Sequence, residues 1–280
     1  MAKNPNSLPL LKDYGYGTKL KKGLILRGTL TWQNGAKYTG ALKSLKKQIP
    51  HGYGIYFFPE NQQWQIINGH KLHRLKSYSG EFKNGNFHGK GTFRSGGEYN
   101  YKGDFKKGRF NGKGKIEYDS GESFEGIFKN DKKVKGKWIF ENGDIYEGEI
   151  KNESSHGKGK AIYKKSGKTY VGQFKEGAFH GKGKWWTDKG EVCVGEFKNG
   201  GRHGWCKQTF TKGEVAGTQY IGQWKDNLKS GKGRMKYYDG AEYKGYWKND
   251  EYNGIGILKE VSGEVYKGIW SNGELTKPKK

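Results

Sequence analysis

The stretch YVGQFKEGAFHGKGKWW, residues 170–186, decides the fold of this chain. It begins with an aromatic residue, a glycine and a second aromatic residue at two-residue steps, namely Tyr170, Gly172 and Phe174. Alternation with a period of two is typical of a β-strand and does not fit a helix. A Glu-Gly turn signal follows, and then a pair of glycines two residues apart, Gly181 and Gly183. The stretch therefore predicts one β-hairpin.

The same spacing of an aromatic residue, a glycine and an apolar residue occurs ten times, mostly 23 residues apart. The first residue of each copy, position 0 of a repeat, is Tyr38, Tyr78, Tyr101, Phe124, Tyr146, Tyr170, Tyr220, Tyr243 or Tyr266, and Cys193 in a degenerate copy. Residues that define the repeat include Tyr78, Gly80, Phe82, Gly89, Gly91, Tyr101, Gly103, Phe105, Tyr170, Gly172, Phe174, Gly181, Gly183, Tyr243, Gly245 and Trp247. Such a period indicates a repeat protein in which each copy is one supersecondary unit.

Two turn signals per repeat separate two short strands, which predicts an antiparallel meander. A two-residue type I′ turn at positions 6 and 7, which Asn-Gly favours, would pair residues whose positions add up to 13. Tyrosine at position 0 would then face the glycine at position 13, and the glycine at position 2 would face the glycine at position 11. The large ring would cover the bare glycine backbone, and we infer that this is why the glycines are there.

We therefore expect an all-β fold, an elongated single-layer antiparallel meander of about ten tandem hairpins, twisted and curled into a trough. Residues 1–30 would form an N-terminal cap, 31–275 the repeat array with an insertion at 57–77, and 276–280 a basic tail. The composition agrees with a thin structure lined by aromatic rings. Only 32% of the residues are hydrophobic, too few for a thick core, whereas 15% are aromatic, too many for a disordered chain.

The net charge of +25 favours anionic partners, which include nucleic acid, anionic lipid and acidic protein tails. Single-stranded nucleic acid also needs exposed rings for stacking. The rings here are used in the packing of the repeat, which disfavours nucleic acid.

Two cysteines are too few for a disulfide framework and favour a reducing compartment. No apolar run is long enough for a secretory signal or a membrane span, so we expect no transmembrane segment. A mitochondrial location stays open, although the N-terminal segment lacks the usual Arg and Ser enrichment.

The segments YSGEFKNGNFHGKG (78–91) and YKGDFKKGRFNGKG (101–114) resemble MORN repeats, named for membrane occupation and recognition nexus. The resemblance extends over about 38–275. It implies an elongated array of β-hairpins in a scaffold or tether, as in radial spoke heads and cytoskeletal proteins, or in a regulatory segment of lipid kinases. It is the basis for expecting a cytoskeletal or ciliary setting.

Two repeats depart from the pattern. In the Phe124 repeat, Lys135 and Lys137 stand where glycines are expected and Gly136 is out of register, which predicts a bulge or a register change. In the degenerate repeat, Cys193 occupies position 0 and Cys206 occupies position 13. The pairing rule makes them a facing pair, so we expect their sulfur atoms to approach each other.

The sequence contains no pattern that indicates catalysis, a cofactor or a metal. Histidines precede the glycine pair in several repeats (His51, His88, His156, His180 and His203), but strand spacing separates them along the sheet, which favours a structural role. The run SGKT at 166–169 matches the end of a phosphate-binding loop, but Ile162 stands where that loop requires glycine. We expect a protein without enzyme activity.

Candidate partner-binding residues lie in the insertion and at the turns. They are Trp64, Lys71, His73 and Arg74 in the insertion, and Lys106, Lys107, Lys132 and Lys133 at turns. A solvated loop and a solvated basic edge are the alternatives for these two groups.

From these features we expect a non-enzymatic scaffold or adaptor in a cytoplasmic assembly, cytoskeletal or ciliary. It would bind other protein subunits through the aromatic trough and the basic edges. The alternatives are a peripheral module on anionic phospholipids and a regulatory subunit that positions a separate enzyme.

Overall fold

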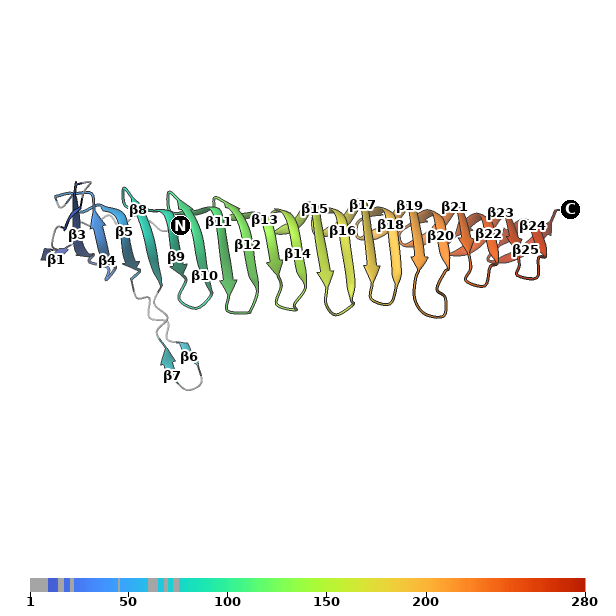
Figure 1. Ribbon diagram of the computed structural model, residues 1–280, viewed down its shortest axis with the longest axis horizontal. Helices are drawn as coiled ribbons and strands as arrows, with labels where there is room; N and C mark the ends of the chain where they lie inside the picture. The colour runs from blue at the N-terminus through green and yellow to red at the C-terminus, as the bar shows by residue number, and fades with distance from the viewer. Residues whose placement is uncertain are drawn as a thin grey trace. The chain divides into compact units, whose positions relative to one another are not determined.

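The computed structural model describes residues 10–14, 18–20, 23–44, 46–59, 65–67, 70–72 and 76–279, with side chains for 26–44, 46–59 and 76–279. The chain divides into two units, Met1–Glu141 and Asn142–Lys280. Regular structure in the described residues is β-strand throughout. Each unit is an open, single-layer antiparallel meander, in which the strands of the array lie side by side in chain order (Figure 1). The predicted all-β array of hairpins is confirmed.

Unit 1 contains β1 to β13. These are β1 (Leu10–Tyr14), β2 (Thr18–Leu20), β3 (Gly23–Thr31), β4 (Lys37–Leu42), β5 (Pro50–Phe57), β6 (Gln65–Ile67), β7 (His70–Leu72), β8 (Ser77–Lys83), β9 (Asn86–Arg94), β10 (Tyr99–Lys106), β11 (Arg109–Tyr118), β12 (Ser123–Lys129) and β13 (Lys132–Ile139). The short strands β6 and β7 pair only with each other, and β5 pairs directly with β8. The insertion therefore leaves the ladder of the array uninterrupted.

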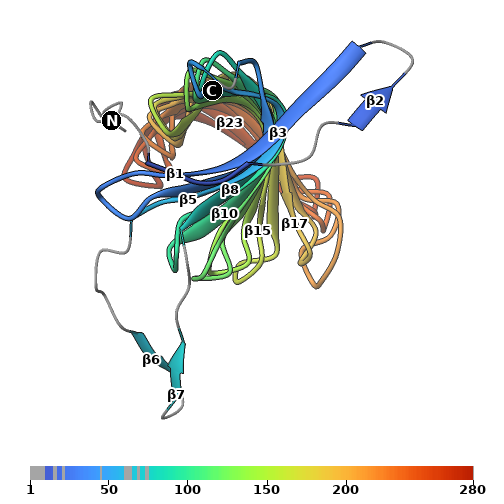
Figure 2. The ribbon, with the colours of Figure 1, turned by 90° about the vertical axis from the view of Figure 1, so that its left-hand side faces the viewer.

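Unit 2 contains β14 to β25. These are β14 (Ile145–Lys151), β15 (Ser154–Tyr163), β16 (Lys168–Lys175), β17 (Ala178–Thr187), β18 (Glu191–Lys198), β19 (Gly201–Phe210), β20 (Gln219–Lys225), β21 (Leu228–Lys236), β22 (Glu242–Lys248), β23 (Glu251–Lys259), β24 (Val265–Ser271) and β25 (Glu274–Pro278). Figure 2 shows that neighbouring strands fan out within each unit, as expected of a twisted sheet.

The ends of the array differ from the expected boundaries. β3 already pairs with β4 in the register of the repeat, with Gly28 opposite Gly40 and Leu30 opposite Tyr38. The repeat pattern thus begins before residue 31, and both β1 and β2 pair with β3. At the other end β25 pairs with β24, so residues 276–278 belong to a strand.

The register of the hairpins corrects the pairing rule. Next to the turn, Phe174 lies opposite Phe179, as a type I′ turn predicts. Further along, Tyr170 lies opposite Trp185, and the glycine at position 2 faces the glycine at position 13. A bulge shifts the register by two residues, so the prediction that position 0 faces position 13 is wrong. The bulge arises at Gly181, whose φ of 56° is a conformation that favours glycine.

The ring at position 0 covers the two paired glycines of its own repeat. A Cβ atom at Gly183 would lie 2.3 Å from Tyr170 Oη, and one at Gly172 would lie 2.6 Å from the Cα atom of Gly183. The Tyr170 hydroxyl donates a hydrogen bond to the carbonyl oxygen of Gln173 at 2.9 Å. The same bond, to the residue three positions on, is made by Tyr38, Tyr78, Tyr101, Tyr146, Tyr220 and Tyr243.

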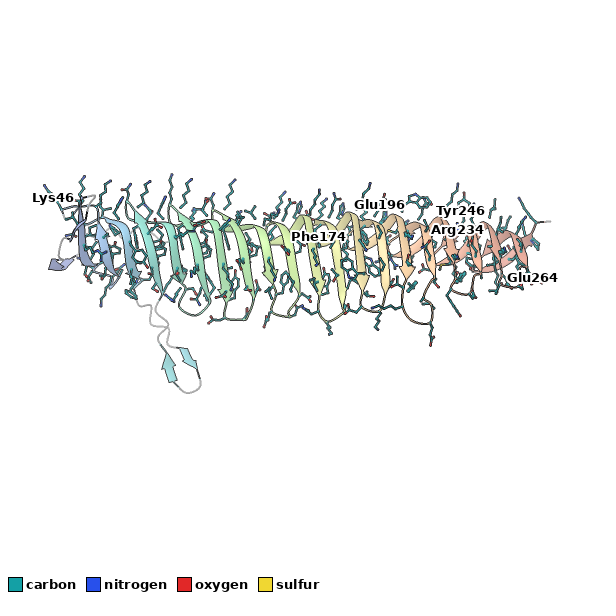
Figure 3. The ribbon with its side chains drawn as sticks, viewed as in Figure 1. Lys46, Phe174, Glu196, Arg234, Tyr246 and Glu264 are labelled. Carbon is teal, nitrogen blue, oxygen red and sulfur yellow. The ribbon has the colours of Figure 1, made fainter. Side chains whose placement is uncertain are left out.

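Successive repeats are joined by contacts between rings. Tyr170 stacks on Phe179 with ring centroids 3.8 Å apart, and meets Phe174 edge to face at 5.0 Å. It also meets Phe197 of the next repeat edge to face at 5.3 Å. Such pairs contribute about 0.5–1.5 kcal/mol each beyond burial. The face that carries these rings, marked by Phe174 in Figure 3, is called the inner face here, and the opposite face the outer face.

The tight turns are also tied to one another. In each unit the backbone N–H at position 7 donates a hydrogen bond to the carbonyl at position 9 of the preceding repeat, for example from Gly108 to Phe87 at 2.9 Å and from Gly200 to Phe179 at 3.0 Å. We call this side of the sheet the tight-turn edge. On the other side the connections vary in length and include the insertion at 57–77.

Alkaline pH should unfold the strands that carry Tyr146, Tyr170 and Tyr243. Burial raises the pKa of Tyr146, Tyr170 and Tyr243 to about 12, whereas an unfolded tyrosine titrates near 10. The contribution of these phenols to folding is complete below pH about 10 and is lost progressively as the pH rises to about 12. Circular dichroism and tyrosinate absorbance, recorded on the same samples, should change together. Tyrosines that titrate near 10 with the strands intact would contradict the role of these rings.

Candidate functional site

The inner face is filled by the chain's own rings. Tyr78, Tyr101 and Tyr170 have no exposed surface, and Phe82 and Phe174 are at most 4% exposed. A partner segment in the expected trough therefore has no access to the rings at positions 0 and 4. The tight-turn edge and the outer face remain accessible to a partner.

A basic depression lies at the tight-turn edge of unit 1, the edge marked by Lys46 in Figure 3. The cavity measures about 650 Å³, and Lys106, Lys107, Arg109 and Lys129 line it. Ile127 and Val134 form its apolar part and are 39% and 37% exposed. We call this cavity the basic pocket.

The geometry of the basic pocket follows from the two turns beside it. Lys107 and Gly108 have φ angles of 51° and 78°, and Asn130 and Asp131 have φ angles of 50° and 71°, as type I′ turns require. The Asp131 N–H donates to the Phe110 carbonyl at 3.0 Å, which fixes the second turn against the first hairpin. The lysines therefore stand on a rigid support.

The charge of the basic pocket is largely uncompensated. Arg109 lies 3.9 Å from Asp131, and both side chains are more than half exposed. Within the residues described by the structure, Lys106, Lys107 and Lys129 have no ion-pair partner. Clustered cations of this kind attract carboxylates and phosphates.

The structure separates the other candidate residues. Lys132 is exposed at the start of β13. Lys133 is not an edge residue, because its side chain is only 6% exposed and its amino group lies 3.7 Å from the centre of the Trp138 ring. It occupies position 9, where a ring stands in four other repeats, namely Phe87, Phe110, Phe179 and Tyr252. Trp64, His73 and Arg74 lie outside the described residues, and Lys71 is described only as backbone in β7.

The Phe124 repeat contains the register change that its glycines indicate. Gly136 lies opposite Gly126 and Trp138 lies opposite Phe124. The bulge in β13 is one residue shorter than that of the Tyr170 repeat, so Gly136 takes the role of position 13. This explains why lysines flank it.

The two cysteines are buried together on the inner face, but they do not lie directly opposite each other. Cys193 faces Gln208, and Cys206 faces Gly195. The interaction with the neighbouring Cys206 thiol, together with burial, raises the pKa of the Cys193 thiol.

Cys206 takes over the hydrogen bonds of the missing tyrosine hydroxyl. Its thiol donates to the carbonyls of Glu196 at 3.1 Å and His203 at 3.9 Å, at positions 3 and 10 of the repeat. Tyr170 donates to the carbonyls at the same two positions. The cysteine pair therefore replaces one tyrosine ring.

The outer face of unit 2 carries a feature that reasoning from the sequence missed. Basic and aliphatic residues share one row of directly opposed positions across β15 to β24, and they alternate strictly from β15 to β21. The row consists of Lys160, Val171, Lys184, Val194, Lys207, Ile221, Arg234, Lys244, Ile257 and Lys267. All ten are exposed. We call this row the outer ladder. The residues of the outer ladder occupy positions 1 and 14 of the repeats, which do not belong to the aromatic and glycine pattern that defines the repeat.

Among the described residues, no group of three or more His, Cys, Asp or Glu side chains is placed to hold a metal ion. A helix long and apolar enough to cross a membrane is likewise not found in that part of the chain.

Tandem hairpins with a tyrosine over paired glycines define a β-hairpin repeat protein. The family model of the MORN repeat matches residues 49–63, 78–97, 101–123, 124–145, 170–191, 193–215, 220–242 and 243–263, more than half of the chain. The chain belongs to the MORN-repeat family. A search of curated protein sequences gave no significant match.

A search of solved structures found similarity to two chains at low TM-scores. One is the TCP domain of SAS-4 (dCPAP) of Drosophila melanogaster, in complex with a proline-rich motif of Ana2 (dSTIL). Its identity is 17%, the match covers 56% of this chain and 83% of that chain, and the TM-score is 0.34. The other is the E1021V mutant of the TCP10 domain of Danio rerio CPAP, at 11% identity, 90% and 98% coverage, and a TM-score of 0.24. Likenesses at these scores carry no argument about function.

Proposed function

We propose that this protein is a non-enzymatic scaffold that binds an acidic segment of a partner protein in the basic pocket of unit 1. The observation that supports this most directly is the cluster of Lys106, Lys107, Arg109 and Lys129 around one cavity. The adjoining apolar surface of Ile127 and Val134 suits a peptide better than a free anion. MORN-repeat membership supports a role as an interaction module.

Rigidity supports the scaffold role. The hydrogen bonds between neighbouring turns hold the pocket in shape before a partner binds, so little ordering entropy is lost on binding. The family resemblance favours a cytoskeletal or ciliary assembly as the setting. If the bound partner is an enzyme, the protein acts as a regulatory subunit through the same surface.

Reversing charge in the basic pocket should weaken binding of an acidic peptide. The test measures fluorescence anisotropy of labelled oligoglutamate at about 50 mM salt. The double variant Lys106→Glu/Lys107→Glu should bind roughly tenfold more weakly, because two attractive charges become repulsive. The matched control Lys151→Glu/Lys175→Glu makes the same charge change at turn positions of unit 2, and should alter affinity less than about twofold.

Equal losses in both variants would show that binding follows net charge alone, and would reject the pocket. A second probe, vesicles that contain phosphatidylserine, separates the membrane alternative. Vesicle binding that depends on Lys106 and Lys107, without peptide binding, would replace the scaffold proposal with a peripheral membrane module.

A further inference from the structure

The residues of the outer ladder repeat at a regular distance, which can be compared with the distance at which the side chains of a bound peptide repeat. Neighbouring strands lie about 4.8 Å apart, so alternate members of the row repeat about every 9.6 Å. Lys160, Lys184 and Lys207 stand on β15, β17 and β19, two strands apart each time. Val171, Val194 and Ile221 lie between and beyond them and are 42%, 46% and 41% exposed.

The cations of the ladder are available to a partner. Within the described part of the chain, Lys160 and Lys207 have no ion-pair partner, and Lys184 contacts only the ring of Trp186, at 5.5 Å. Arg234, which is labelled in Figure 3, is already held by Glu242 at 2.6 Å. In the part of the ladder from β15 to β20, Lys160, Lys184 and Lys207 therefore carry the charge that an anionic partner would meet.

A large aromatic side chain stands beside the ladder. Trp205, at position 12, is 52% exposed on the outer face and lies two residues before Lys207 on β19. The corresponding residues in other repeats of unit 2 include Lys158, Lys182 and Lys232. A tryptophan exposed where the repeat has lysine makes no contribution to the inner face. Tryptophan is enriched among the residues that contribute most of the binding energy at protein interfaces.

Among regular peptide conformations, polyproline II matches the period of the ladder most closely. It repeats every three residues, or about 9.3 Å. Seven residues of an α-helix advance about 10.5 Å, and two residues of a β-strand about 6.7 Å. Over three periods the mismatch with the ladder is about 1 Å for polyproline II and about 3 Å for the helix. Proline rings also pack well on an exposed tryptophan.

We propose that the outer face of unit 2 binds a protein segment in the polyproline II conformation, with a carboxylate at every third residue and prolines between. The segment runs across the strands. Its carboxylates meet Lys160, Lys184 and Lys207, and its prolines pack against the intervening valines and Trp205. The proposal rests on the scaffold function but uses a different surface from the basic pocket.

The test compares two labelled peptides of identical composition with the full chain. One repeats Glu-Pro-Pro over about twelve residues, and the other has the same residues with the glutamates grouped at one end. We expect the regular peptide to bind at least about tenfold more tightly, because only its charges match the ladder. Equal affinities, or tighter binding of an acidic helix with glutamate at every seventh residue, would overturn the proposal.

Two variants localise the binding. Lys184→Glu/Lys207→Glu should weaken the regular peptide roughly tenfold. Lys175→Glu/Lys198→Glu makes the same charge change at the tight-turn edge and should change affinity less than about twofold. Trp205→Lys introduces the residue that other repeats carry there, so the fold is preserved, and affinity should fall roughly tenfold. No effect of Trp205→Lys, or equal effects of both charge variants, would reject this surface.

The outcomes separate this inference from the proposed function. Lys106→Glu/Lys107→Glu should leave binding of the regular peptide within about twofold of the natural chain. If that variant abolishes binding of the regular peptide, the basic pocket of unit 1 is the binding surface and the outer ladder is not. If oligoglutamate fails to bind but the regular peptide binds, the pocket proposal fails and the ladder stands.

Discussion

Replacing both cysteines with the residues of a regular repeat, Cys193→Tyr together with Cys206→Gly, should leave the chain at least as stable as it is now. The new ring would cover glycine, as in the Tyr170 repeat. Its hydroxyl would donate to the carbonyls of Glu196 and His203, which the Cys206 thiol contacts at present. The double variant therefore replaces the packing of the cysteine pair with the tyrosine-over-glycine packing that the other repeats of the chain already have.

The single substitutions should behave differently. With Cys193→Tyr alone the ring collides with the Cys206 side chain, because the equivalent Gly183 leaves only 2.3 Å between an added Cβ and the tyrosine oxygen. We expect a loss of about 2 kcal/mol from overpacking. Cys206→Gly alone leaves a cavity and should cost about 1 kcal/mol or more. The coupling between the two sites should therefore be about 3 kcal/mol.

Urea unfolding followed by circular dichroism and tryptophan fluorescence would measure these free energies. Hydrogen exchange of β18 and β19 would check that the loss is local, because repeat arrays can unfold in parts. Val194→Tyr, next to Cys193 but on the outer face, is the matched control and should change stability by less than about 0.5 kcal/mol. If the double variant lost as much free energy of unfolding as the two single variants together, this prediction would be contradicted.

Gly183→Ala should be the most damaging glycine substitution in its repeat. The added methyl group would lie 2.3 Å from Tyr170 Oη and 2.6 Å from the ring carbon beside it, inside a packed face. Since the ring is buried and stacked, it cannot turn aside. We expect a loss of about 3 kcal/mol, read from the urea midpoint and slope.

The turn glycine Gly177 provides the comparison for this substitution. Its φ is 84° and nothing lies within 4 Å of an added Cβ, so Gly177→Ala should cost only about 1 kcal/mol of backbone strain. Transplanting the cysteine pair, as Tyr170→Cys with Gly183→Cys, should recover most of the loss at Gly183. Equal losses of stability in Gly183→Ala and Gly177→Ala would mean that the packing of the Tyr170 ring does not require a glycine beneath it.

Much of the fold could be predicted because the same pattern of aromatic residues and glycines occurs ten times in the sequence. The strands, the tight turns and the role of a ring over bare glycine follow from spacing alone. The register beyond the turn did not follow, since it depends on the left-handed backbone of Gly181 and its equivalents. A glycine that bulges and a glycine that pairs look alike in a sequence.

The candidate sites were less predictable for a related reason. Lys106 and Lys107 could be found from turn positions, and they line the basic pocket. Lys133 could not be distinguished from them, because it takes the place of a ring and packs on Trp138, a contact that only the folded chain reveals. The outer ladder depends on which residues of different strands lie opposite each other. That information is absent until the register is known.

The two edges of each sheet differ in how firmly they are held, and this has a consequence for how such a chain can lengthen. The two-residue turns bond to the hairpins beside them, so an extra residue there would disturb those contacts. The connection at 43–49 between β4 and β5 is longer and is the exception at this edge of unit 1. The opposite connections already carry the insertion at 57–77 in unit 1 and the loop at 211–217 in unit 2, with every flanking strand still paired. New modules, tags or whole domains can therefore be inserted more readily at the margin opposite the tight turns, and each one inserted there would emerge on the same side of the sheet.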